Sequence, residues 1–325
     1  MREFLGGDLQ EIVEKSKTLH ENFRNANILI LGPNGFIGNW LRESFSHLNQ
    51  SLVLNIKVTG IVRKSTEIAI KSGELYREQS FQTWHDSRED PLVTHVFHCA
   101  TNSRRLDDQG KESMNEVINL TTNTIQKISK NAAPKFIHLS SGAVYGESAR
   151  KEKIIKITTP TESYSNLDAY GRVKLKIENL VNEATGKGQI VGGNPRLFSF
   201  FGPGLGLDLQ FAISSFVKSA MNGNHIEVMG NPATERTYMY PTDLISELLK
   251  CADSPSVEPI HIGGAENMSM QEIAENVARV WNVKVETPKE LLTKPNFYNP
   301  EVVDVKDSVS LSQGLSRWKD WLTAN

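Results

Sequence analysis

Two side chains that could exchange a proton with a substrate stand four residues apart in the stretch DAYGRVK, residues 168–174. Tyr170 and Lys174 occupy positions i and i+4, which are neighbours on one face of a helix. A free tyrosine titrates at about pH 10, and an ammonium beside it favours the phenolate. The pair therefore predicts that Tyr170 exchanges a proton with a substrate hydroxyl. From the spacing alone, a surface tyrosine packed on a lysine stem is the commoner arrangement, so the rest of the chain must decide between the two.

A glycine-rich turn, LGPNGFIG, is the second candidate for chemistry. Gly32, Gly35 and Gly38 recur at every third position, directly after a predicted strand and at the entrance of a predicted helix. Glycine lets the backbone approach a pyrophosphate, whose charge is favoured by a helix N-terminus. This context favours nucleotide binding over a merely tight turn. The other candidate cofactor contacts in the turn are Asn34, Phe36 and Ile37.

The end of the second predicted strand, in GIVRKS, bears on the choice between NAD and NADP. NAD-binding sheets commonly place an Asp or Glu there for the ribose hydroxyls, whereas an Arg accommodates a 2′-phosphate. This stretch contains Arg63 and Lys64 and no carboxylate. A solvated basic turn is the plain alternative, but beside a glycine turn the two cations favour NADP, with NAD possible.

Two serines, Ser140 and Ser141, follow a predicted strand in HLSSGAVYG. Open α/β sheets place their ligands at the carboxyl ends of strands, so a hydroxyl there can bond the oxygen on which Tyr170 acts. The surrounding residues lack the nucleophile-elbow pattern, which disfavours a hydrolase triad.

These residues must be positioned by strands that alternate with helices along the first two hundred residues. The pattern predicts an α/β fold with a doubly wound parallel sheet. The expected strands lie near 27–31, 55–62, 80–84, 95–100, 135–141 and 190–200, and the expected helices include 111–130 and 169–184. We expect an N-terminal helix in 1–25, a dinucleotide-binding domain in 26–200 plus 241–264, and a smaller substrate lobe in 201–240 plus 265–325.

Composition narrows the class of protein. The chain has 325 residues and a net charge of −2, so neither nucleic acid nor an anionic membrane is an expected partner. The two cysteines, Cys99 and Cys251, indicate neither a disulfide framework nor a metal site. No apolar run approaches the ~18 residues of a membrane span, and the N-terminus carries acids where a signal peptide needs an apolar core. We therefore expect a cytoplasmic protein without a metal.

Six motifs occur in the order found in extended short-chain dehydrogenases/reductases. They are GPNGFIG, FHCAT, SSGAVYG, AYGRVK, RLFSFFGPG and RTYMYPTDL. The chain resembles the NAD-dependent epimerase/dehydratase family from about residue 26 to residue 285. The resemblance implies a nucleotide-diphosphate sugar as substrate and a homodimer, and the N-terminal helix resembles one in a branch that makes bacterial surface polysaccharides.

The resemblance also implies individual roles. Tyr170 would be the acid–base, Lys174 would lower its pKa and bind the nicotinamide ribose, and Ser141 matches the catalytic Ser/Thr. The further implied contacts are Asp86 near the adenine, Ala100 and Thr101 along the cofactor, Arg236 on the sugar-nucleotide diphosphate and Ser199 in place of a substrate-binding Asn. A salt bridge at the rim of the site is the alternative for Arg236.

Departures from the family pattern limit the reaction. Sugar-nucleotide 4,6-dehydratases carry acidic residues just after the catalytic Ser/Thr, where this chain has Gly142 and Ala143, so dehydration is disfavoured. Phe201 replaces the usual Tyr before GPG. We expect hydride transfer at C4 of the sugar, with a 4-ketoreductase favoured by Arg63, a 4-epimerase as the alternative, and a non-catalytic NADP-binding sensor or scaffold as a third class.

Overall fold

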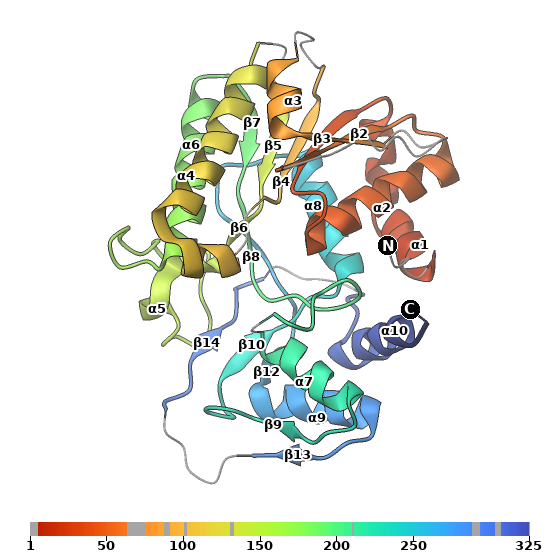
Figure 1. Ribbon diagram of the computed structural model, residues 1–325, viewed down its shortest axis with the longest axis vertical. Coiled ribbons are helices and arrows are strands. Elements are labelled where there is room, and N and C mark those ends of the chain that lie inside the picture. The colour runs from red at the N-terminus through yellow and green to blue at the C-terminus, as the bar shows by residue number, and fades with distance from the viewer. Residues whose placement is uncertain are drawn as a thin grey trace.

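The computed structural model describes residues 6–63, 76–87, 92–100, 103–130, 133–209, 211–287, 293–302 and 307–324, with side chains in 103–130 described from residue 114 onward. Figure 1 shows a layered α/β domain above a smaller lobe. Lys64 and Thr101 lie outside the described residues.

A parallel six-stranded sheet forms the centre of the upper domain, in the order β3-β2-β1-β4-β5-β7. Its strands are β1 Asn27–Leu31, β2 Lys57–Val62, β3 Tyr76–Ser80, β4 His95–His98, β5 Lys135–His138 and β7 Val191–Gly193. The strand order reverses between β1 and β4, and ligands of such sheets bind at the carboxyl ends beside this reversal. The predicted doubly wound fold is confirmed.

Helices cover both faces of the sheet because alternate side chains of each buried strand point to opposite faces. In β1, Ile28 and Ile30 join one apolar core, and Leu29 and Leu31 join another. The first core includes α1 Gly6–Lys15, α2 Phe36–Leu52 and α8 Pro241–Asp253. The second includes α3 Phe81–Asp86, α4 Ser103–Ile128 and α6 Ala169–Gly186.

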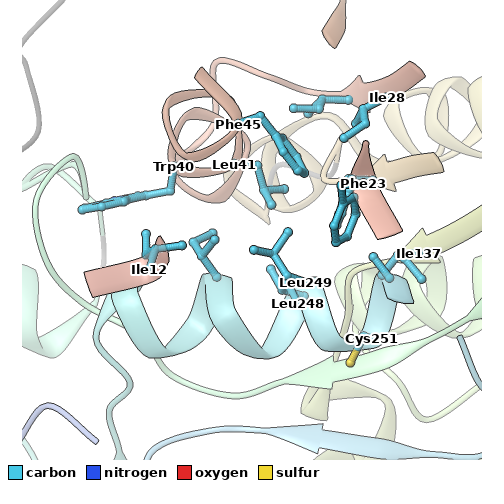
Figure 2. Packing of buried hydrophobic residues seen from close by; sticks show 14 of the residues in the cluster. Ile12, Phe23, Ile28, Trp40, Leu41, Phe45, Ile137, Leu248, Leu249 and Cys251 are labelled. Atoms are coloured by element: carbon cyan, nitrogen blue, oxygen red, sulfur yellow. The ribbon is translucent and has the colours of Figure 1, made fainter. Parts of the chain in front are cut away.

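The first core shows how α8, which lies far along the chain, completes the sheet domain. Leu248 and Leu249 of α8 point toward Leu41 and Phe45 of α2, with Phe23 beside them (Figure 2). All of these side chains are buried.

The smaller lobe has its own apolar core, which includes Phe201, Phe216, Ile273 and Trp318. Its elements are α7 Ala212–Met221, α9 Met270–Trp281, α10 Leu311–Ala324, the strand pair β9 Ile226–Glu227 and β13 Val285–Glu286, and a sheet of β12 Asn267–Ser269, β10 Glu235–Thr237 and β14 Phe297–Tyr298.

A third sheet joins β6 Ser140–Ser141, β8 Pro195–Leu197 and β11 Ile260–Ile262. The short elements η2 Gly142–Tyr145 and α5 Gly146–Ala149 follow β6.

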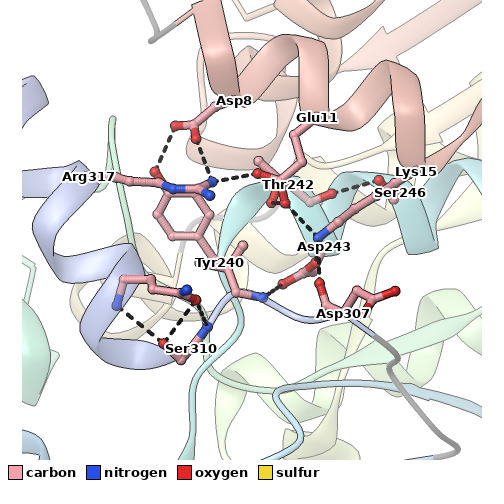
Figure 3. A network of polar contacts seen from close by, with 12 residues as sticks. Asp8, Glu11, Lys15, Tyr240, Thr242, Asp243, Ser246, Asp307, Ser310 and Arg317 are labelled. Carbon is pink, nitrogen blue, oxygen red and sulfur yellow. Dashed lines mark hydrogen bonds and ion pairs between the residues drawn. The ribbon is translucent and has the colours of Figure 1, made fainter.

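The N-terminal helix α1 is bonded to both α8 and α10 (Figure 3). The carboxylate of Asp8 accepts hydrogen bonds from the Tyr240 hydroxyl at 2.7 Å and from Arg317 at 2.9 Å. Arg317 also donates to Glu11 at 2.6 Å, and Lys15 pairs with the buried Asp243. These contacts fix α1 where the sheet domain meets the lobe.

Three sequence predictions of local structure were wrong in detail. The strand expected at 80–84 is helix α3, because Ser80 caps that helix by accepting the backbone N–H of Thr83 at 3.0 Å, and the strand precedes it as β3. The N-terminal helix expected in 1–25 ends as α1 at Lys15 and is followed by a 3-10 helix, η1 Lys17–Phe23. The expected strand over 190–200 divides into β7 and β8, which belong to different sheets.

None of the helices in the described ranges is both long and apolar enough to cross a bilayer. Within the same ranges, no group of three or more His, Cys, Asp or Glu side chains could hold a metal ion.

Candidate active site

The close approach of α6 to η2 brings Tyr170 to Ser141. Asp168 caps α6 by accepting the N–H of Gly171 at 2.6 Å, so Tyr170 lies in the first turn of the helix. A Cβ on Gly171 would lie 3.0 Å from the carbonyl oxygen of Ala143 in η2. The glycine between Tyr170 and Lys174 therefore permits a contact that a larger residue would push apart.

Lys174 lies beneath Tyr170 and is 3% exposed. Its Nζ donates to the carbonyl oxygen of Leu139 at 2.5 Å and lies 5.5 Å from the centre of the Tyr170 ring. Burial lowers the pKa of Lys174 to about 8, against smaller upward effects of Cys99 and Glu178. The ammonium is therefore held by the strand end, at the floor of the site.

The expected lowering of the Tyr170 pKa does not appear. Burial raises the pKa of the Tyr170 phenol, Tyr298 and Asp168 raise it further, and only the Ser141 hydroxyl acts in the opposite direction. The helical spacing was predicted correctly, but the net effect of the surroundings keeps the phenol protonated. A protonated phenol at this position can donate a proton or a hydrogen bond.

The Ser141 hydroxyl has a second aromatic neighbour, Tyr298 of β14. Oγ of Ser141 accepts the N–H of Ala143 at 3.2 Å and lies 3.2 Å from the hydroxyl of Tyr298. The Tyr298 ring centre is 4.7 Å from that of Phe198. Sequence reasoning missed Tyr298, because no motif spacing connects NFYNP with the distant serine motif.

A buried polar network contacts β6, the strand of Ser140 and Ser141. Glu178 of α6 accepts two hydrogen bonds from Arg196 of β8, at 3.0 and 2.7 Å, and one from Ser140 at 2.5 Å. Arg196 also donates to the hydroxyl of Tyr145 at 2.8 Å. This oxygen lies 2.6 Å from Nε2 of His261, whose Nδ1 is 3.1 Å from the carbonyl oxygen of Glu301. The network therefore ties β6 to the chain segment that carries Tyr298.

The glycine turn has the geometry that a pyrophosphate requires. Gly32 has φ +82°, and a Cβ there would lie 3.0 Å from Cα of Ala100, which places Ala100 directly beside the turn. A Cβ on Gly38 would lie 2.2 Å from the carbonyl oxygen of Gly32. Only glycine fits these two positions, and α2 begins at the turn with its N-terminus toward the sheet edge. These residues fit a dinucleotide cofactor.

The other residues expected at the cofactor take several positions. Phe36 stacks on Phe200 with ring centres 5.1 Å apart, and Ile37 is partly buried against the first core. Arg63 is exposed just after β2. Asp86 is exposed at the end of α3, where Gln82 and His85 lower its pKa.

A carboxylate does reach the glycine turn, and it comes from β3. Oε2 of Glu78 accepts the Tyr76 hydroxyl at 3.1 Å and lies 3.4 Å from the amide nitrogen of Asn34. Glu78 pairs with Gly60 of β2, where a Cβ would lie 2.5 Å from the Tyr76 hydroxyl. Because the third strand was predicted at 80–84, sequence analysis missed Glu78. Gly60, in TGIV, was the one signal in the sequence that another side chain approaches β2 closely.

Besides Ser141, Arg236 and Ser199 were predicted to bind the substrate. Arg236 of β10 donates to the side chain of Asn296 at 2.6 Å and to its carbonyl oxygen at 3.2 Å. Burial, followed by the neighbouring Arg150, lowers the pKa of Arg236. Ser199 is half-buried, and its carbonyl oxygen accepts the N–H of Met239 at 3.0 Å.

Comparison with known proteins agrees with this geometry. The family model described as "NAD dependent epimerase/dehydratase family" matches residues 28–263. The chain belongs to this family. It is therefore an enzyme of the extended short-chain dehydrogenase/reductase type, and the family is NAD-dependent.

Individual relatives are distant but cover nearly the whole chain. UDP-glucuronic acid decarboxylase 5 of Arabidopsis thaliana is 24% identical over 320 residues, covering 90% of this chain and 87% of the relative. An epimerase from Methanothermobacter thermautotrophicus has a similar fold, with TM-score 0.74, 18% identity and coverage of 98% and 96%. UDP-glucuronic acid 4-epimerase from Bacillus cereus, solved with NAD, gives TM-score 0.71, 20% identity and coverage of 91% and 96%.

Proposed function

We propose that this enzyme transfers a hydride at C4 of a nucleotide-diphosphate sugar. The observation that carries the proposal is the convergence of Ser141, Tyr170 and Lys174 at the strand ends beside the glycine turn. The nicotinamide, when bound, accepts or supplies the hydride. Ser141 polarises the C4 oxygen, and Tyr170 exchanges its proton with that oxygen. Lys174, fixed by Leu139, binds the nicotinamide ribose.

The nucleotide part of the substrate is supported by Arg236 and by the relatives. UDP-linked sugars are named for the Arabidopsis decarboxylase and for the Bacillus epimerase. Arg236 is half-buried at the lobe side of the site, where a guanidinium can bind a diphosphate through two parallel hydrogen bonds. We therefore propose a UDP-sugar as the first substrate to test.

Among reactions at C4, we propose 4-epimerisation first. Gly142 and Ala143 offer no acid beside Ser141 for removing water. An epimerase returns the hydride to the same sugar, so it suits the NAD dependence of the family. Glu78 beside the glycine turn also favours NAD, since a carboxylate binds ribose hydroxyls and repels a 2′-phosphate. Reduction of a 4-keto sugar with NADPH is the second candidate, favoured by the exposed Arg63 at the end of β2.

A cofactor-retention assay distinguishes the two reactions. An epimerase keeps its nicotinamide through every turnover, whereas a reductase must release oxidised cofactor each cycle. Purified protein is denatured, and the released cofactor is quantified by chromatography. Near-stoichiometric NAD, with interconversion of UDP-sugars in the absence of added cofactor, supports the epimerase. Little bound cofactor, with turnover only when NADPH and a 4-keto sugar are added, supports the reductase.

A substrate panel tests the broader proposal. UDP-glucose, UDP-glucuronic acid and their 4-keto derivatives are incubated with the protein and NAD or NADPH, and products are identified by mass spectrometry. Oxidation of a hexuronate at C4 yields a β-keto acid, so loss of CO2 from UDP-glucuronic acid would also indicate hydride transfer at C4. Absence of any change across the panel would contradict the proposal and leave the cofactor-binding sensor.

We also propose that the enzyme is a homodimer, as the family resemblance implies, and that it is cytoplasmic, as expected from the sequence. Light scattering coupled to size-exclusion chromatography measures the assembly, and fractionation of the cells measures the location.

A further inference from the structure

Tyr298 of the lobe strand β14 lies beside Ser141, and two arginines lie near its ring. The Arg150 guanidinium carbon lies 5.1 Å from the centre of the Tyr298 ring, and that of Arg236 lies 5.9 Å from it. Both distances are within the range of cation–π attraction, which is strengthened where water is excluded. The ring is half-buried, so its position is determined by these neighbours and by Phe198.

The hydroxyl of Tyr298 occupies the space that Gly142 leaves empty. A Cβ on Gly142 would lie 2.8 Å from the Tyr298 hydroxyl and 2.7 Å from the Phe198 ring. A side chain at the position directly after Ser141 would therefore displace Phe198, Tyr298 or both. Burial raises the pKa of the Tyr298 phenol, so the group is a neutral hydrogen-bond donor at the reaction centre.

Arg236 connects this phenol to the predicted diphosphate position. Besides facing the ring, its guanidinium bonds to the side chain and the carbonyl oxygen of Asn296, two residues before Tyr298. Residue 236 also pairs with residue 298 in the register of β10 and β14. A diphosphate that engages Arg236 must therefore act on the same short strand that places the phenol beside Ser141.

We propose that Tyr298 is a substrate-positioning residue, whose hydroxyl binds a sugar oxygen next to the one held by Ser141 and whose placement is coupled to the diphosphate through Arg236. This inference rests on the proposed nucleotide-sugar function. It assigns a reason for Gly142: the position after the serine must lack a side chain so that a phenol from the lobe can reach the sugar.

The test combines Tyr298→Phe with substrates that lack one oxygen. Tyr298→Phe keeps the ring near the two arginines and removes the hydroxyl, and we expect kcat/KM for the UDP-sugar to fall about 10-fold to 100-fold. The 3-deoxy and 6-deoxy sugars are both assayed. With the analogue that lacks the contacted oxygen, kcat/KM of the variant and of the parent should differ less than twofold. Tyr164→Phe, at a tyrosine that is 47% exposed, is the matched control and should leave both values unchanged.

Equal losses with the complete sugar and with both deoxy analogues would overturn the contact, because a merely structural role would not distinguish the substrates. The coupling is measured by repeating Tyr298→Phe in an Arg236→Gln background. We expect a smaller penalty there than in the parent, and additive penalties would overturn the coupling.

Binding separates this inference from the proposed function. Titration calorimetry with UDP-glucose and with UDP requires no turnover. If Tyr298 binds the sugar, Tyr298→Phe weakens UDP-glucose at least fivefold and leaves UDP unchanged. Equal affinities of the variant and the parent for UDP-glucose would overturn the inference, even if the parent epimerises the sugar.

Discussion

The hydroxyl of Tyr298 lies 3.2 Å from Oγ of Ser141, although 157 positions separate the two residues. Ser141 ends a short strand of the sheet domain, and Tyr298 ends a short strand of the lobe sheet. The candidate active site is therefore assembled from both parts of the molecule. Displacement of β14 would change the surroundings of Ser141 without moving β1 and β4, which adjoin the glycine turn.

Removal of the Tyr170 hydroxyl should abolish most of the activity. In Tyr170→Phe the proton donor is lost while the half-buried ring remains, so we expect a fall in rate of about 10²–10⁴. Cofactor affinity and the unfolding midpoint should stay close to those of the parent. Steady-state kinetics and cofactor titration check both expectations, and turnover within a few fold of the parent would reject Tyr170 as the acid–base.

The pH dependence of kcat/KM should follow the protonation of Lys174. Its folded-state pKa, lowered to about 8 by burial, means that the ammonium is lost as pH rises through that value. If the charged form binds the cofactor ribose, kcat/KM should be constant below the pKa and fall above it. Lys174→Arg keeps its charge and should move this limb to higher pH. Lys176→Arg, at an exposed position of the same helix, is the control; an unmoved limb in Lys174→Arg would assign it to another group.

The choice of cofactor should depend on Glu78 and Arg63 in opposite ways. Glu78→Gln removes a carboxylate beside Asn34 and should weaken NAD by ~1.5–3 kcal/mol, the range for hydrogen bonds to a charged group. Arg63→Ala should weaken NADP by a similar amount and leave NAD nearly unchanged. Fluorescence titration with NADH and NADPH measures all four affinities. Equal loss of both cofactors in either variant would mean that the residue is structural.

The buried ion pair beneath Ser140 should dominate the stability of this region. Arg196 and Glu178 have side chains that are 8% and 5% exposed, so Arg196→Met leaves a buried charge unpaired and should lower the free energy of unfolding by ~3–5 kcal/mol. Lys187→Met breaks a pair whose side chains are 60% and 61% exposed and should cost less than ~1 kcal/mol. Urea unfolding measures both variants. Similar losses would show that the buried pair contributes no more than a surface pair.

Local patterns in the sequence determined the parts of the site that lie within one turn or one helix. The glycine turn follows from three glycines at intervals of three residues, and the common face of Tyr170 and Lys174 follows from helical periodicity. The alternation of strands and helices determined the doubly wound sheet in the same way, since each element buries a face that its own residues define. These inferences need only short-range geometry.

Tertiary structure decided the remaining features because they depend on contacts between distant segments. Glu78 reaches the glycine turn because β3 pairs with β2 in a register that places Glu78 opposite Gly60. A prediction that shifts β3 by a few residues therefore misses this contact. The direction of the Tyr170 pKa follows from burial, which helical spacing does not specify. Tyr298 reaches Ser141 because Gly142 leaves space between two parts of the fold. The sequence alone proposed the residues for the cofactor side of the site, and only packing decided which residues face them from the lobe.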